Sequence, residues 1–104
     1  MDKRIYLAIY HYDQALQFTK DEMRPTHRDF TRQLHDNGIL LATGSTQSFG
    51  YFGSLTIMRA DSAEQVRELL ADDPYITSGF VKELKVLEWR PVVGEVVSES
   101  KSTN

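Results

Sequence analysis

The chain of 104 residues contains no cysteine, no excess of basic residues and no N-terminal apolar run of signal-peptide character. The absence of cysteine excludes disulfides, thiol nucleophiles and cysteine-ligated zinc, and it agrees with a cytoplasmic protein. The stretch that follows Met-Asp-Lys-Arg contains tyrosine and histidine, so it is too polar for a signal-peptide core or a membrane span. These absences predict a soluble cytoplasmic protein that is not associated with a membrane.

Charge and length narrow the possible functions further. The 12 lysine and arginine residues are outnumbered by 15 acidic residues, which gives a formal net charge of -3. Proteins that bind nucleic acid usually carry a basic patch, so nucleic acid is not expected as a partner. A chain of this length normally forms one domain with a single core.

The N-terminal third predicts one strand and one helix. Residues 4–11 alternate between two apolar sets on opposite faces of a strand, namely Ile5, Leu7 and Ile9 against Tyr6, Ala8 and Tyr10. A strand that is apolar on both faces usually lies in a sheet that is covered on both sides. Pro25 is favoured as a first helical residue, so a helix is predicted over residues 25–36, where Asn37-Gly38 supplies the stop.

The rest of the chain predicts three more strands and a second helix. Residues 39–43 suit a strand, and residues 54–60 alternate as its hairpin partner. Ser62 is placed to cap a helix that ends near residue 72, with Gln65 completing a capping box, and residues 80–89 contain the last strand. The loop predicted between residues 44 and 53 contains three aromatic residues beside glycines: Phe49, Tyr51 and Phe52.

The predicted element order, β-α-β-β-α-β, is the ferredoxin-like pattern of an α+β fold, in which both helices lie on one face of a four-stranded antiparallel sheet. The other face would be bare in a monomer, so the apolar residues on both faces of the first and last strands predict a homodimer with stacked sheets. This domain is expected over residues 1–91. In the extension over residues 92–104, residues 92–97 could add an edge strand or an arm, and residues 98–104 are expected to be disordered.

Two short motifs offer a histidine and a carboxylate. Arg24-Pro25-Thr26-His27 opens the first predicted helix, and Asp73-Pro74-Tyr75 follows the second. A carboxylate can fix the tautomer of an imidazole, so the pair would be a minimal acid–base unit if the two residues meet. The alternatives are a partly buried core histidine and an aspartate that only ends a helix. His11 and His35 lack the spacing from His27 that would place metal ligands on one helical face, so no metal site is expected.

Several motifs in this order resemble the YciI-like, or YCII-related, family of small dimeric α/β-barrel proteins. They are Arg24 with His27, Leu40-Leu41-Ala42-Thr43-Gly44, Phe52-Gly53-Ser54, and Asp73-Pro74-Tyr75 with Gly79. The resemblance covers the chain to about Pro91 and implies a homodimer with a cleft beside the sheet, in which His27 and Asp73 form a catalytic dyad. One branch of the family looks like a lyase that acts on chlorinated hydroxylated aromatics. The aromatic loop and the valine-rich extension depart from the family pattern.

The cleft that the resemblance implies would bind a small molecule without a cofactor. Arg24 could bind a carboxylate or phenolate, Ser54 and Tyr75 could donate hydrogen bonds, and Phe49, Tyr51 and Phe52 could form an apolar wall or lid. The free N–H groups of a helix that begins at residue 25 would also favour an anionic group nearby. The alternatives are a solvated surface charge, a backbone hydrogen bond, and packing at the dimer seam.

Three functions therefore remain open from the sequence. The first is a small cofactor-independent lyase or isomerase, whose dyad of His27 and Asp73 moves a proton on a small cyclic or carboxylated substrate. The second is a non-catalytic small-molecule-binding module, and the third is a structural dimer module. Replacement of His27 by alanine separates the first two, because turnover would collapse in an enzyme whereas binding would survive in a module.

Overall fold

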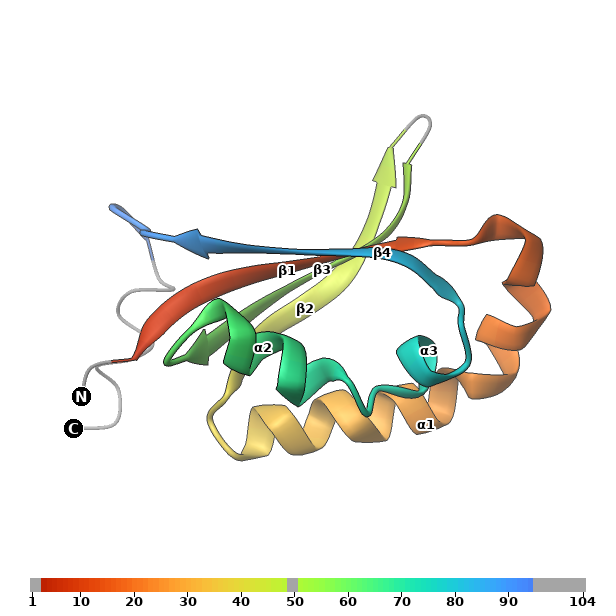
Figure 1. The fold of residues 1–104 in the computed structure, drawn as a ribbon, viewed down its shortest axis with the longest axis horizontal. Coiled ribbons are helices and arrows are strands. Elements are labelled where there is room, and N and C mark those ends of the chain that lie inside the picture. Colours follow the sequence, from red (N-terminus) through yellow and green to blue (C-terminus); the bar gives the residue numbers. More distant parts are fainter. Residues whose placement is uncertain (1–2, 49–50, 95–104) are drawn as a thin grey trace.

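The computed structural model describes residues 3–48 and 51–94, which form a sheet and a layer of helices on one of its faces (Figure 1). The four strands are antiparallel in the order β2-β3-β1-β4, with β1 at Arg4–Tyr12, β2 at Leu40–Ser48, β3 at Tyr51–Ala60 and β4 at Val81–Trp89. The helices are η1 (Gln14–Leu16), α1 (Gln17–Asp36), α2 (Ala63–Leu70) and α3 (Pro74–Thr77). This topology confirms the predicted ferredoxin-like α+β fold. None of the helices in the described ranges is long and apolar enough to cross a membrane.

The alternation of β1 divides the core from the open face of the sheet. Four side chains point toward the helices and are at most 3% exposed: Tyr6, Ala8, Tyr10 and Tyr12. Tyr6 pairs with Met58 of β3, which is also fully buried. Tyrosine suits this face because its ring fills the core while its hydroxyl can reach a polar group in the helical layer.

The open face of the sheet carries the second apolar set. No helix of the described residues covers this face (Figure 1). Leu87 of β4 is 51% exposed on it. Its other large apolar side chains are Ile5, Leu7, Ile9, Leu55, Ile57 and Trp89. The homodimer with stacked sheets remains a prediction, and this face has the apolar character that such packing requires.

α1 begins at Gln17, so the predicted helix start at Pro25 is wrong. Pro25 lies in the helix interior, where it has no N–H for the carbonyl of Asp21, a defect that costs about 3 kcal/mol relative to alanine. Free backbone N–H groups were expected beside His27, because the helix was predicted to begin there. α1 begins at Gln17 instead, so in the described part of the helix the N–H groups next to His27 lie in its interior and are not free. Upstream of Pro25, Met23 of α1 and Leu16 just before it pack against the core, which favours extension of the helix in this direction.

β2 and β3 are also longer than predicted, and most of the expected aromatic loop belongs to these strands. Their pairing continues to Ser48 opposite Tyr51. A polar segment can form a strand here because β2 is the edge of the sheet, where water solvates its outer side. The end of this hairpin projects away from the helical layer (Figure 1). Its turn, at residues 49–50, lies outside the described residues.

α2 begins as predicted. The Ser62 hydroxyl accepts a hydrogen bond from the Gln65 N–H at 3.1 Å, and the Gln65 side chain accepts one from the Asp61 N–H at 2.7 Å. α2 ends at Leu70, close to the predicted stop, and the short helix α3 that follows was not predicted. The expected C-terminal arm and disordered tail lie mostly in residues 95–104, outside the described residues.

Candidate active site

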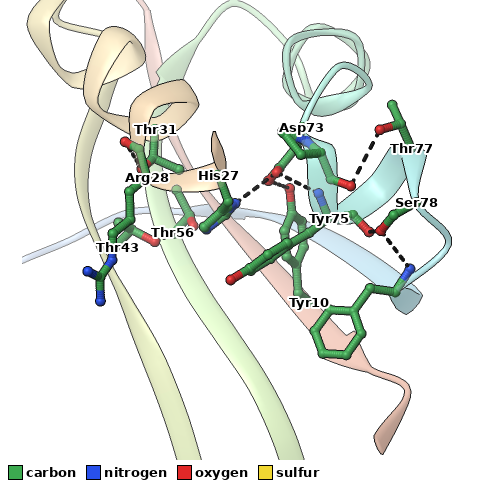
Figure 2. A network of polar contacts seen from close by, with 12 residues as sticks. Tyr10, His27, Arg28, Thr31, Thr43, Thr56, Asp73, Tyr75, Thr77 and Ser78 are labelled. Atoms are coloured by element: carbon green, nitrogen blue, oxygen red, sulfur yellow. Dashed lines mark hydrogen bonds and ion pairs between the residues drawn. The ribbon is translucent and has the colours of Figure 1, made fainter. Parts of the chain in front are cut away.

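His27 of α1 and Asp73 at the start of α3 meet beside the sheet (Figure 2). The Nδ1 atom of His27 lies 2.8 Å from Oδ1 of Asp73. The side chain of Asp73 is 1% exposed and that of His27 is 15% exposed, so the contact lies at the edge of the buried interior. The two side chains that the motifs offered are therefore in contact, and their catalytic role remains a prediction.

Asp73 is held by two further hydrogen bonds, which orient both of its oxygens. Oδ1 accepts from the Tyr75 N–H at 3.0 Å, which caps α3, and Oδ2 accepts from the Tyr10 hydroxyl at 2.7 Å. An ionised carboxylate can only accept hydrogen bonds, so Nδ1 of His27 must carry the proton in this contact. In the neutral imidazole this leaves Nε2 unprotonated, with a lone pair that can accept a proton.

Tyr10 is a neutral hydrogen-bond donor to Asp73. Burial raises the pKa of its phenol far above the ordinary value, and the negative charge of Asp73 and the hydrogen bond to it raise the pKa further. The phenol therefore keeps its proton at neutral pH and donates it in the hydrogen bond to Asp73. Because Tyr10 engages Oδ2, Oδ1 is left to His27 and the cap of α3.

The ring of Tyr75 fixes the plane of the imidazole. The two rings are stacked with centroids 3.8 Å apart and an interplanar angle of 5°. Burial raises the pKa of the Tyr75 phenol, and the nearby Arg24 partly opposes this rise. With Asp73 at its Nδ1 edge and Tyr75 on its face, the His27 ring is restricted to one orientation.

A cavity of about 440 Å³ opens beside His27 and is large enough for a small molecule. Its wall contains two arginines, no acidic side chain and six hydroxyl groups, so it suits a ligand that is anionic and accepts hydrogen bonds. Asp73 does not line the cavity but supports His27 from behind. The lining residues are Tyr12, Arg24, His27, Arg28, Thr31, Thr43, Gly44, Ser45, Ser54 and Tyr75.

Three of the predicted substrate-binding residues, Arg24, Ser54 and Tyr75, line this cavity. Phe52 does not line it, because its ring packs edge-on against Tyr12 in the core, with the centroids 5.3 Å apart. Phe49 lies outside the described residues, and so does the side chain of Tyr51. Phe52 therefore does not form the aromatic wall of the cavity that was predicted for it.

Sequence reasoning missed Arg28, Thr31 and Tyr10. Arg28 and Thr31 follow Arg24 at the fourth and seventh positions, which is the spacing of one helical face, so a helix that included residue 24 would have grouped them. The alternation of β1 places Tyr10 on the helix side, but nothing in the local sequence indicates that it meets Asp73. Within the described ranges, no group of three or more histidine, cysteine or acidic side chains could hold a metal ion.

A profile of the YCII-related domain matches residues 5–90 of the chain. The chain belongs to this family. Sequence comparison with curated proteins finds no match for this YCII-related protein.

Similar solved structures show the same fold. One is 5-chloro-2-hydroxyhydroquinone dehydrochlorinase from Burkholderia phenoliruptrix AC1100, in complex with 2,5-dihydroxybenzoquinone. It has a TM-score of 0.74 and 19% identity, and the match covers 85% of this chain and 95% of that chain. A protein from Mycobacterium tuberculosis has a TM-score of 0.52 and 9% identity, covering 88% of this chain and 97% of that chain. A hypothetical Arabidopsis thaliana protein has a TM-score of 0.52 and 8% identity, and the match covers 90% of this chain and 92% of that chain.

Proposed function

We propose that this protein is a small cofactor-independent enzyme, of the lyase or isomerase type, in which His27 moves a proton on a small cyclic or carboxylated substrate. The observation that carries this proposal is the 2.8 Å contact of His27 Nδ1 with the buried Asp73 carboxylate. The contact leaves Nε2 as the nitrogen that can exchange a proton with a molecule in the cavity. A base positioned in this way typically contributes about a hundred- to ten-thousand-fold in rate.

The proposed proton transfer begins with His27 neutral and protonated on Nδ1. Nε2 takes a proton from an acidic C–H or O–H bond of the substrate, and the electron pair of that bond moves toward a conjugated oxygen of the substrate. Asp73 stabilises the imidazolium that forms, and Tyr10 keeps the carboxylate in place. An isomerase would return the proton to another carbon. A lyase would instead let the electron pair expel a leaving group while the proton passes to solvent.

The wall of the cavity supports a substrate whose oxygen becomes negative during this step. Arg24 and Arg28 supply positive charge, and the hydroxyls of Ser54 and Tyr75 can donate hydrogen bonds to the same region. The stacked Tyr75 ring also presents its electron-rich face to the imidazolium. The similarity in fold to a dehydrochlorinase that binds a hydroxylated quinone supports a ring-sized substrate with acidic oxygens.

The proposed enzyme is a homodimer in which the open faces of two sheets stack. The apolar residues of β1, β3 and β4 on that face, with Leu87 half exposed among them, support this arrangement. Two-fold stacking would bury the same patch on both copies.

Solvent deuterium exchange tests the proposed chemistry. The probes are hydroxylated quinones and cyclic ketones that carry a carboxylate, and exchange at their carbon-bound protons is followed by proton NMR. Wild-type protein is expected to accelerate exchange in at least one probe, and His27→Ala to reduce that rate by about 10²- to 10⁴-fold. Gln33→Ala, at an exposed position of the same helix, is expected to keep the full rate.

Two results would contradict the proposal. One is that wild-type protein accelerates exchange in none of the probes. The other is that His27→Ala accelerates exchange as much as wild-type protein does. Probe binding without exchange would favour the non-catalytic binding module.

A further inference from the structure

Arg28 differs from the other arginines described on α1. Among the described residues, Arg28 has no ion-pair partner. The other two arginines described on α1 each lie near an acidic side chain of the same helix: Arg24 is 2.7 Å from Asp21, and Arg32 is 3.9 Å from Asp29. In a protein with a net charge of -3, an arginine that no carboxylate neutralises is available to an external anion.

Arg28 also lies where two hollows join. The cavity beside His27 continues into a second hollow of about 380 Å³ between α1 and β2, and the two share Arg28, Thr31 and Thr43. Beyond the shared residues, the second hollow is lined by Leu40, Leu41 and Ala42 of β2 and by Arg32 and His35 of α1. In Figure 2 the Arg28 side chain extends toward Thr43 and away from Asp73. No acidic side chain among the described residues lines either hollow.

We propose that Arg28 anchors the carboxylate of an organic acid whose reacting part occupies the cavity beside His27. A single guanidinium fork matches the two oxygens of one carboxylate, and hydroxyls of the cavity wall can bind the oxygen substituents of a ring. Along its β2 side, where Leu40, Leu41 and Ala42 lie, the second hollow gives room for a further substituent beyond the carboxylate. This inference rests on the proposed function, because it names the class of substrate that the site of His27 takes.

Arg24, which the sequence favoured for this role, is the weaker anchor. Its guanidinium is already bound to Asp21 at 2.7 Å, and an incoming carboxylate would have to compete with that pair. Arg24 remains beside the cavity and close to Tyr75, so it can contribute positive charge without a direct ion pair to the substrate.

Two probes that differ by one carboxylate test the anchor. Titration calorimetry at neutral pH compares 2,5-dihydroxybenzoate with hydroquinone, which has the same ring hydroxyls but no carboxylate. Wild-type protein is expected to bind 2,5-dihydroxybenzoate about 10- to 100-fold more tightly, the usual range for a charge-assisted hydrogen bond. Arg28→Met keeps the apolar stem of the side chain and is expected to abolish this preference.

Arg67→Met, at an exposed arginine of α2, is the matched control and is expected to keep the preference. Thermal unfolding of both variants verifies that they are folded. Equal affinity of wild-type protein for the two probes, failure of both to bind, or a preference that survives in Arg28→Met would each overturn the proposal.

The test separates the anchor from the chemistry. His27→Ala is expected to keep the preference for the carboxylate, because Arg28 is intact in it. If Arg28→Met loses the preference while wild-type protein exchanges no substrate proton, the anchor stands and the enzymatic proposal fails. If exchange depends on His27 and Arg28→Met changes nothing, only the anchor fails.

Discussion

Tyr10 and Asp73, which are 63 residues apart in the chain, share a buried hydrogen bond from Oη to Oδ2 at 2.7 Å. Tyr10 is not among the residues that line the cavity, and its hydrogen bond to Asp73 links it to His27. This makes Tyr10 a positioning residue that ties β1 of the core to the candidate active site.

We predict that Tyr10→Phe lowers the free energy of unfolding by about 1–3 kcal/mol, because Oδ2 of a carboxylate that is 1% exposed loses its donor. Urea unfolding measures the change. Tyr6→Phe, at a tyrosine of the same strand that is also buried but does not bind Asp73, is the control and is expected to cost less. Equal losses in the two variants would argue against a special role of the Tyr10 hydroxyl.

The raised pKa of Tyr10 predicts a loss of stability at alkaline pH. Below pH of about 10, both the folded and the unfolded chain keep this proton, so the group adds no pH dependence. Above it, the unfolded chain ionises while folded Tyr10 stays neutral, so the free energy of unfolding falls as pH rises, by about 1.4 kcal/mol per pH unit. Urea unfolding between about pH 9 and pH 11 is expected to show a shallower slope in Tyr10→Phe. An unchanged slope would contradict the assignment.

The helix at Pro25 shows why the sequence predicted the fold better than the element boundaries. Alternation in β1, the Ser62 cap and Gly38 after α1 are local signals, and each appears in the structure where it was predicted. The start of α1 depends instead on how Leu16 and Met23 pack against the core, which outweighs the local preference of proline. The polar part of β2 likewise forms a strand because β2 lies at the edge of the sheet, and this position depends on the fold as a whole.

Pro25→Ala tests the position of this residue. In a helix interior the substitution restores an N–H for the Asp21 carbonyl and removes a steric conflict. Proline also restricts the unfolded chain, and the loss of this restriction offsets part of the gain. The free energy of unfolding is therefore predicted to rise by about 1–3 kcal/mol. Urea denaturation measures this change. A neutral or destabilising effect would instead place residue 25 at the start of the helix.

The candidate site was only partly predictable for the same reason. The motifs identify His27 and Asp73 as chemically suitable, and the family match places the chain among YCII-related proteins. Tyr10 and Arg28 enter the site through packing across the core and through the unexpected length of α1. Such contacts between distant segments leave no local pattern in the sequence.

Leu87→Lys tests the proposed homodimer. A lysine on the open face would have to be desolvated between two stacked sheets, so the variant is predicted to sediment as a monomer at micromolar concentration. Gln33→Lys adds the same charge to an exposed position of the helical layer and is expected to remain dimeric. A monomeric wild-type protein in analytical ultracentrifugation would contradict the stacked-sheet arrangement.

The tautomer of His27 tests the central claim most directly, because it needs no substrate. Long-range proton–nitrogen NMR on ¹⁵N-labelled protein, at a pH where the ring is neutral, distinguishes a protonated Nδ1 from a protonated Nε2. We predict a protonated Nδ1 and a free Nε2 in wild-type protein, and loss of this preference in Asp73→Asn, whose amide can itself donate to Nδ1. A proton on Nε2 in the wild type, or the same tautomer in both proteins, would contradict the role of Asp73 in preparing His27 as a base.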